Sequence, residues 1–372
     1  MRILVDPEIF QYGRCGMTRY YAALCHGLKE RGHTVIIPLY LSGSDFIRGK
    51  FGEFLPLPKH PRFRFPSRFI NQFAMRAAKK AYYEALRKGD YDIALVTSPL
   101  YEDRFLDYVS GRPWVMVVHD TMRSIVTPDG LLDPSGPLSD RLAYLARRAS
   151  KVICISETTA RDLQSLAGIK PERLAVIHTG LLLTAKEAEV LPVELPDTFL
   201  LFVGERTGRK NFRGFLSAIA PLLIKQPDLY LVCTGSFNKW EIDMLIWYGV
   251  VHKVRVIRAT DSVLVRLYRA AKCLVYPSLY EGYGLPVLEA MRFGCPVITS
   301  PIGAIQEIAG DAVLYASPFD PEAQREAISL LLDDPATENR MREAGPIRAN
   351  AFSFEDMIRK FETELSMISC QG

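Results

Sequence analysis

Short apolar runs alternate with amphipathic stretches along most of the 372-residue chain. The runs are too short for helices and are bounded by turn residues, so they predict buried strands. In the first half they lie at residues 3–5, 34–37, 93–96, 114–118 and 152–155. In the second half they lie at residues 199–203, 230–233, 254–257, 272–276 and 297–299. Helical patterns separate them, and this alternation is typical of parallel sheets flanked by helices.

The polar, proline-bearing stretch 184–197 has no clear apolar period and separates the two series of runs. We therefore predict an amino-terminal domain over 1–183, a linker over 184–197 and a carboxyl-terminal domain over 198–352. With 372 residues, 48% of them hydrophobic, the chain can bury two cores. The predicted fold class is α/β, with two Rossmann-like domains whose parallel sheets face each other across a cleft, a usual place for a ligand.

A glycine-rich turn after the strand 272–276 is bracketed by Glu281 and Glu289. In a parallel sheet such a turn lies at the carboxyl end of the strand, where ligands bind and where a helix start favours an anion. Glu281 precedes the predicted helix and Glu289 lies about one turn inside it, so one small ligand can touch both. Carboxylates at this place suit sugar or ribose hydroxyls. Without context, the pair is more often a loop charge and a solvated helix charge.

Three basic residues, Arg206, Arg209 and Lys210, follow the strand 199–203 in a second glycine turn. They suit a diphosphate, because arginine offers a planar fork of donors and lysine a mobile point charge. A basic turn alone is more often a solvated surface.

Two polar pairs follow strands of the amino-terminal half. His119 and Asp120 end the strand 114–118, where a lone histidine is more often a hydrogen-bonded structural residue. Ser156 and Glu157 follow the strand 152–155, where they are equally typical of a helix N-cap with an acidic first turn. The other histidines have no metal-ligand spacing, so we predict no metal site.

The segment 276–300, YPSLYEGYGLPVLEAMRFGCPVITS, closely resembles the signature of the retaining glycosyltransferases of family four, the group 1 family with a GT-B fold. Tyr283 stands where the family usually has phenylalanine. The similarity continues at residues 267–271, 307–312 and 352–354. The resemblance implies a metal-independent transferase that uses a nucleotide diphosphate sugar and retains the anomeric configuration. It also implies that the last helix, within 353–372, crosses back to the amino-terminal domain.

The resemblance implies roles for the residues that match the family's pattern. Glu281 and His119 would be the catalytic residues, with Glu281 binding the transferred sugar and His119 holding a sugar hydroxyl or orienting the acceptor. Glu289 would bind the ribose. The other donor-binding positions would be Arg206, Arg209, Lys210, Gly282, Tyr283, Gly284, Leu285 and Gly16. The acceptor-side positions would be Asp120, Ser156 and Glu157.

The basic turn departs from the family's pattern at one position. Glu205 stands where many members have arginine, directly after the first glycine of the basic turn. This leaves open whether Arg206 takes over the phosphate contact or Arg209 contributes to it.

The cysteine content, the apolar runs and one absent motif bear on the cellular location and on the enzyme class. The seven cysteines are scattered, odd in number and without a CxxC pair, which favours a reducing cytoplasm. No apolar run reaches the roughly 18 residues of a membrane span, and the amino terminus leads directly into a strand. We therefore expect neither a signal peptide nor a transmembrane helix. A GxGxxG fingerprint is absent, which counts against a nicotinamide-dependent dehydrogenase.

The segment 59–88 contains nine lysines or arginines and one acid, a net charge of +8 against +4 for the whole chain. Aromatic residues are interleaved with the basic ones, which suits an anionic membrane surface and a lipid-linked acceptor. Nucleic acid has no supporting motif elsewhere, and a solvated basic face is as good an interpretation as membrane binding. Peripheral attachment at the inner face of the cell membrane is therefore a hypothesis.

Together these features predict a cytoplasmic glycosyltransferase that needs no cofactor besides its substrates. It would move a hexose to a saccharide or lipid-linked saccharide in bacterial O-antigen, capsule or exopolysaccharide synthesis. Mannose from GDP-mannose is the favoured donor group, because the motif style resembles bacterial mannosyltransferases, and a UDP-sugar comes next. Two alternatives stay open: a sugar-nucleotide epimerase or hydrolase on the same fold, and a non-catalytic module that binds sugar or lipid.

Overall fold

The computed structural model describes residues 1–12, 15–39, 41–42, 46–47, 55–56, 64–97, 104–109, 111–121, 137–184, 194–206 and 208–369. The chain forms two compact units. Unit 1 comprises residues 1–124, 134–182 and 354–372, and unit 2 comprises residues 125–133 and 183–353. The chain thus passes into unit 2 and returns to unit 1 for its last segment. Most of the predicted linker, residues 185–193, lies outside the described residues.

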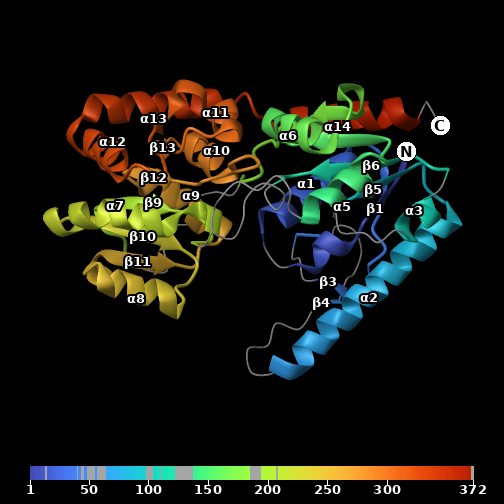
Figure 1. Cartoon of the computed structure of the whole chain (residues 1–372), viewed down its shortest axis with the longest axis horizontal. Coiled ribbons are helices and arrows are strands. Elements are labelled where there is room, and N and C mark those ends of the chain that lie inside the picture. The colour runs from blue at the N-terminus through green and yellow to red at the C-terminus, as the bar shows by residue number, and fades with distance from the viewer. Residues whose placement is uncertain are drawn as a thin grey trace. The chain divides into compact units, whose positions relative to one another are not determined.

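Unit 1 contains a sheet of six parallel strands in the order β2-β1-β5-β6-β7-β8 (Figure 1). The strands are β1 (Arg2–Val5), β2 (Thr34–Ile36), β5 (Ile93–Val96), β6 (Trp114–Val118), β7 (Lys151–Cys154) and β8 (Leu174–Val176). A separate parallel pair consists of β3 (Leu41–Ser42) and β4 (Leu55–Pro56). The helices are α1 (Gly16–Glu30), α2 (Arg64–Lys88), α3 (Arg104–Val109), α5 (Pro137–Ala146), α6 (Glu157–Ala167) and α14 (Phe354–Ser369), with 3-10 turns η1 (Glu8–Gln11) and η2 (Pro171–Arg173).

Unit 2 contains a second sheet of six parallel strands, in the order β11-β10-β9-β12-β13-β14 (Figure 1). The strands are β9 (Thr198–Phe202), β10 (Leu229–Thr234), β11 (Val254–Ile257), β12 (Cys273–Tyr276), β13 (Val297–Thr299) and β14 (Leu314–Tyr315). The helices are α7 (Phe212–Lys225), α8 (Lys239–Trp247), α9 (Asp261–Ala270), α10 (Leu285–Arg292), α11 (Gly303–Ala309), α12 (Pro321–Asp333) and α13 (Pro335–Ala349). The 3-10 turns are η3 (Gly208–Lys210), η4 (Val251–Lys253) and η5 (Gly310–Ala312).

The two sheets confirm the predicted α/β fold class. All ten predicted strands are present, and β5, β6 and β12 are buried along their whole length. Strands buried on both faces show continuous apolar runs rather than alternation, which is why they could be recognised. The strands β8 and β14 were not predicted, because these edge strands are short and only half-buried and so lack such a run.

The strand order reverses once in each sheet. In unit 1 the chain runs from β1 outward to β2 and then continues with β5 on the other side of β1. In unit 2 it runs from β9 outward to β10 and β11 and then continues with β12 on the other side of β9. At such a reversal the loops after the two neighbouring strands diverge and leave a crevice at their carboxyl ends, which is where ligands bind in open α/β sheets.

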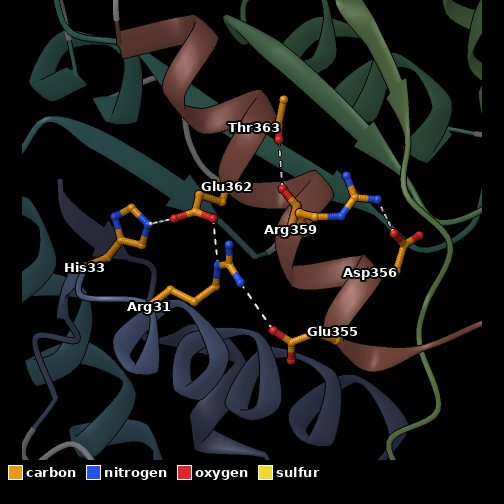
Figure 2. A network of polar contacts seen from close by, with 7 residues as sticks. All are labelled: Arg31, His33, Glu355, Asp356, Arg359, Glu362 and Thr363. Carbon is orange, nitrogen blue, oxygen red and sulfur yellow. Dashed lines mark hydrogen bonds and ion pairs between the residues drawn. The ribbon is translucent and has the colours of Figure 1, made fainter.

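The last helix, α14, is attached to the rest of unit 1 by polar contacts, which Figure 2 shows, and by apolar contacts. The Nε atom of Arg31 lies 2.6 Å from a Glu362 oxygen, and Nε2 of His33 lies 3.0 Å from the other oxygen. Gly27 of α1 makes room for the helix, because a Cβ there would lie 2.6 Å from Cγ1 of Ile358. Within the described residues, no helix combines the length and the apolar character that crossing a bilayer requires.

Candidate active site

The strand reversal of unit 2 brings together three of the predicted site residues. Arg209 and Lys210 lie in η3, which follows β9, and Glu281 lies in the loop after the neighbouring strand β12. Glu281 is 6% exposed. Its Oε1 atom accepts a hydrogen bond from Nζ of Lys210 at 2.7 Å, and its Oε2 atom accepts one from Nη1 of Arg209 at 2.7 Å. The two loops that the sequence singled out therefore share one buried ionic cluster.

Lys210 has a second neighbour that the sequence did not reveal. Its ammonium group contacts the hydroxyl of Tyr276, the last residue of β12, and lies 4.3 Å from the centre of that ring. The two loops are also joined through the backbone, because the Leu279 N–H donates to the Arg209 carbonyl at 2.7 Å. The basic side chains are thus held in place by β12 and its loop as well as by their own turn.

The cluster shifts the proton affinities of its members. Burial opposes the charge of Glu281, but Lys210 and Arg209 outweigh it, so the pKa of this carboxyl lies below its usual value. Burial lowers the pKa of Lys210, while Glu281 limits that fall. The net effect holds Glu281 in its carboxylate form, as a sugar-hydroxyl acceptor requires.

The glycine turn leads into α10 through a backbone conformation that only glycine adopts easily. Gly284 is the N-cap residue, with φ at 113°, and a Cβ there would lie 3.2 Å from Cγ1 of Ile305. Leu285 starts the helix and Pro286 occupies its first turn, where a missing N–H costs nothing. The amides at this helix start are suited to an anion.

Two further residues of the turn are buried. Gly282 is buried, and Tyr283 is 3% exposed, with its ring edge-to-face against Phe352 at 6.5 Å between centres. The Tyr283 side chain therefore contributes to packing.

Glu289 is also buried, at 6% exposure, one turn into α10. The hydroxyl of Tyr268, in α9, donates to its Oε2 atom at 3.0 Å. Burial, and then the carboxylate, raise the pKa of Tyr268 well above its usual value, so the phenol keeps this proton. Tyr268 fixes one oxygen of Glu289. Sequence reasoning missed this tyrosine, although it lies in the matched run 267–271.

Arg206 bonds to a different set of residues from the cluster of Glu281, Arg209 and Lys210. Its Nε atom donates to Glu241 at 2.8 Å, and its two other nitrogens donate to the carbonyls of Thr234 and Ser236. The guanidinium also lies 4.8 Å from the centre of the Phe237 ring. Glu241 completes the capping box of α8, so Arg206 ties the carboxyl end of β10 to the start of that helix. Of the two arginines that the sequence left open, the structure places Arg209 beside Glu281.

His119, in unit 1, follows β6 and is half-buried. Its ring packs edge-on against Tyr20 and Tyr21, at 4.7 and 5.3 Å between ring centres. Burial lowers the pKa of His119 to about 4, so the imidazole is neutral at pH 7. Its Nε2 atom is shielded from solvent and has no hydrogen-bond partner within the described part of the chain. A substrate hydroxyl is a group that such a nitrogen can accept from or donate to. The adjacent Asp120 is half-buried.

The remaining predicted positions of unit 1 lie at helix starts. Ser156 is the N-cap of α6 and accepts a hydrogen bond from the Thr159 N–H at 3.1 Å, while Glu157 is exposed in the first turn. The capping interpretation thus accounts for Ser156. Gly16 is the first residue of α1, after the N-cap Cys15. Residues 13 and 14 of that loop lie outside the described residues.

No group of three His, Cys, Asp or Glu side chains that could hold a metal ion is found among the residues that the structure describes. The acidic residues of the site are instead surrounded by cations and phenols.

Comparison with known proteins identifies the family of the chain. The protein-family model "Glycosyl transferases group 1" matches residues 184–348, and the model "Glycosyltransferase Family 4" matches residues 15–183. Among curated proteins, the O-antigen chain mannosyltransferase B of Escherichia coli is 29% identical over 276 residues, covering 68% of this chain and 72% of that protein. The MMP alpha-(1->4)-mannosyltransferase of Mycolicibacterium hassiacum is 25% identical over 307 residues, covering 77% of this chain and 72% of that protein.

The solved structures show the same fold along the whole chain. The Anabaena protein HepE, in complex with UDP and glucose, has a TM-score of 0.73 at 19% identity and covers 99% of this chain and 100% of its own. The predicted family is thereby confirmed. The chain belongs to the group 1, family 4 glycosyltransferases and has their GT-B fold.

Proposed function

We propose that this glycosyltransferase moves a hexose from a nucleotide diphosphate sugar to a saccharide or lipid-linked saccharide, with retention of the anomeric configuration. The observation that carries the proposal is the buried cluster of Glu281 with Arg209 and Lys210 beside the start of α10. A hydroxyl-binding carboxylate next to two cations and a helix N-terminus fits a ligand that joins a sugar to a diphosphate.

The bond between the anomeric carbon and the donor's phosphate oxygen breaks, and its electron pair stays on the departing diphosphate. Lys210 has three N–H donors and Arg209 five, so each can contact Glu281 and a phosphate oxygen together. These cations and the amides of α10 stabilise the charge that develops on the leaving group, a task that a divalent ion performs in other transferases. We therefore propose a metal-independent reaction.

The acceptor hydroxyl attacks the same face of the sugar from which the diphosphate departs, and its proton passes to the leaving phosphate oxygen. Front-face attack needs no enzyme nucleophile and retains the configuration. Glu281 binds hydroxyls of the transferred sugar and Glu289, oriented by Tyr268, binds the ribose. His119, neutral at pH 7, binds a hydroxyl of the sugar or of the acceptor.

Mannose is the sugar we favour, with GDP-mannose as donor, because both curated relatives described above are mannosyltransferases. A UDP-sugar is second, because the HepE structure contains UDP and glucose. The first relative also supports O-antigen or a related bacterial polysaccharide as the product class.

A thermal-shift panel of GDP, UDP, dTDP, ADP and CMP tests the donor class. A nucleotide at about 100 times its Kd is expected to add about 2.7 kcal/mol to the free energy of unfolding. We expect GDP to stabilise the wild type and Glu326→Ala equally, and Glu289→Ala much less. Glu326 is an exposed glutamate of α12 and serves as the matched control. Stabilisation by UDP alone would replace GDP-mannose as donor, and no stabilisation by any nucleotide would favour the binding-module alternative.

Product analysis tests the reaction itself. Purified enzyme with GDP-mannose and a mannoside acceptor is expected to give an α-linked product by NMR, with the same rate in excess EDTA. A β-linked product would contradict retention, and loss of activity in EDTA would contradict metal independence. Donor consumption without acceptor would instead indicate a hydrolase or epimerase.

We further propose that unit 1 meets an anionic membrane surface through α2. A groove of about 440 Å³ between α2 and α3 is lined by Arg76, Lys79, Lys80, Tyr83, Glu84, Arg87 and Tyr108. The rings of Tyr83 and Tyr108 stack at 4.8 Å between centres, so the groove combines two aromatic rings with four cations and one glutamate. This arrangement suits an anionic headgroup and attachment at the inner membrane face. Residues 59–63 of the basic segment lie outside the described residues.

Pelleting with vesicles that contain anionic lipid tests this attachment. Reversal of Arg76 and Lys80 to glutamate is expected to abolish pelleting. Reversal of Lys170 and Lys225, which are exposed elsewhere, makes the same change in net charge and is expected to preserve it. Equal pelleting of both double variants would contradict a specific role for α2.

A further inference from the structure

The outer side of α8 carries four large apolar side chains although it lies on the surface of unit 2. Trp240, Ile242, Ile246 and Trp247 are 49%, 41%, 58% and 78% exposed. At 3.6 residues per turn Trp240 and Trp247 lie on one flank of the solvent-facing side, and Ile242 and Ile246 lie on the other flank. The buried residues Glu241 and Leu245 face the interior of unit 2. Val251, in the following turn η4, is 45% exposed as well.

The fold of unit 2 does not explain this face. The inner side of α8 is already secured, because Leu245 is 1% exposed and Glu241 bonds both Arg206 and the N-cap Asn238. The chain has only three tryptophans, and the third, Trp114, is 4% exposed in the core of unit 1. Two of three tryptophans are therefore placed in solvent on one nine-residue helix. Large exposed apolar patches on soluble proteins mark interaction sites.

The size of the face indicates the kind of partner. If a fully exposed tryptophan or isoleucine presents roughly 200–250 Å², the four exposed fractions correspond to about 500 Å². A standard protein interface buries about 800 Å² on each partner, of which about 56–65% is apolar. The α8 face thus supplies about the apolar area that one half of a stable interface needs.

The charges on the same face favour a protein partner over lipid, and they favour a second copy of α8 as that partner. Asp243 is exposed between Trp240 and Trp247, three and four residues away, and a carboxylate at this position opposes insertion into lipid. Lys239 lies one turn before Asp243 and is also exposed. When two copies of α8 meet antiparallel about a two-fold axis that passes between these levels, Lys239 of each copy faces Asp243 of the other. The face is therefore complementary to itself in charge, as an isologous interface requires.

We propose that α8 is the contact surface between two copies of this chain, which associate as a two-fold dimer through Trp240, Ile242, Ile246 and Trp247. The Lys239–Asp243 pairs lie along the middle of the interface and set its antiparallel direction, and the four apolar side chains flank them. This proposal concerns a surface outside the candidate active site and does not depend on the identity of the donor or acceptor.

Sedimentation equilibrium of the full chain, from about 1 to 100 μM, tests the dimer. The wild type is expected to dimerise in this range, and Ile246→Asp to weaken association by at least about tenfold, because a charge replaces a large apolar contact. Ile224→Asp is the matched control, since Ile224 on α7 is 62% exposed against 58% for Ile246. This control is expected to dimerise like the wild type.

A charge exchange tests the direction of the contact. Lys239→Asp and Asp243→Lys are each expected to weaken the dimer by about three- to tenfold, because each places like charges opposite one another. The double variant Lys239→Asp/Asp243→Lys is expected to restore association. Thermal unfolding below 1 μM, where the chain is mostly monomeric, shows whether the variants remain folded.

Three results would overturn the proposal. One is a wild type that remains monomeric up to about 100 μM. Another is equal association of Ile246→Asp and Ile224→Asp. The third is loss of vesicle binding by Ile246→Asp with no change in molecular mass, which would assign the face to lipid instead.

Discussion

The two sheets each bury a carboxylate at the point where the strand order reverses, but they treat it differently. Across the reversal in unit 1, Asp6 accepts hydrogen bonds from the backbone N–H and the hydroxyl of Thr97, at 3.0 and 2.7 Å. Across the reversal in unit 2, Glu281 accepts from the charged groups of Lys210 and Arg209. The two Thr97 donors are neutral and join two strand ends, whereas the two cations beside Glu281 also carry charge of the sign that a diphosphate would need. We therefore expect the reversal of unit 2 to carry the chemistry.

The largest effect is expected from Glu281→Gln. The amide keeps the shape of the side chain but removes the charge that Lys210 and Arg209 stabilise and weakens acceptance from sugar hydroxyls. We expect kcat to fall by about 10²- to 10³-fold, which is typical for one preorganised electrostatic group. Initial rates of donor turnover measure the loss. An activity within threefold of the wild type would place the catalytic centre elsewhere.

Within unit 2, the two arginines of the basic turn are expected to differ in role, Arg206 in stability and Arg209 in nucleotide binding. Arg206→Lys is expected to lower the free energy of unfolding by about 3 kcal/mol, because it breaks a buried pair and two bonds to carbonyls. Arg209→Lys, at a site that is 27% exposed, is expected to weaken nucleotide binding about tenfold with little change in stability, because the planar fork is lost. Denaturant unfolding and nucleotide titration, made on both variants, separate the effects. A reversal of the two outcomes would assign the phosphate contact to Arg206.

Thr97→Val tests whether the strand reversal of unit 1 has a structural role only. It removes one neutral donor to Asp6 and is expected to cost about 1–3 kcal/mol of stability, because a buried acceptor loses a partner. Nucleotide affinity is expected to stay unchanged. A large loss of affinity without a loss of stability would show that the reversal in unit 1 also binds the donor.

The smallest expected effect is on the stability of the protein at acid pH. Glu281 has a folded pKa below its ordinary value of 4.5, so the unfolded chain binds more protons between these two values. The stability that this group contributes is complete above pH 4.5 and is lost as pH falls through its folded pKa. In Glu281→Gln the fall of unfolding free energy below about pH 5 is therefore expected to be shallower than in the wild type. Urea unfolding at a series of pH values measures both slopes, and parallel curves would contradict the ionic pairing.

The sequence predicted most of the fold because buried parallel strands have a simple signature. The sequence also indicated Glu281, Arg209 and Lys210 as candidate site residues, because each of them follows such a strand. It could not show that Arg206 bonds Glu241, a partner 35 residues away in sequence, whereas Arg209 bonds Glu281. Tyr268 and Tyr276 were missed as site residues because tyrosines in apolar runs have no local mark that distinguishes packing from hydrogen bonding. Such roles arise only when distant elements meet.

The return of α14 to unit 1 has a consequence for how the chain is made. On the ribosome, residues 183–353 are all synthesised before the helix that carries Ile358 and Glu362, so unit 2 can complete its core first. Unit 1 keeps the α1 surface around Gly27 uncovered until residues 354–369 emerge. Domains generally fold as units during synthesis, and uncovered apolar surface favours aggregation. The amino-terminal unit, although its synthesis begins first, is therefore expected to complete its packing after unit 2 and to expose apolar surface for longer.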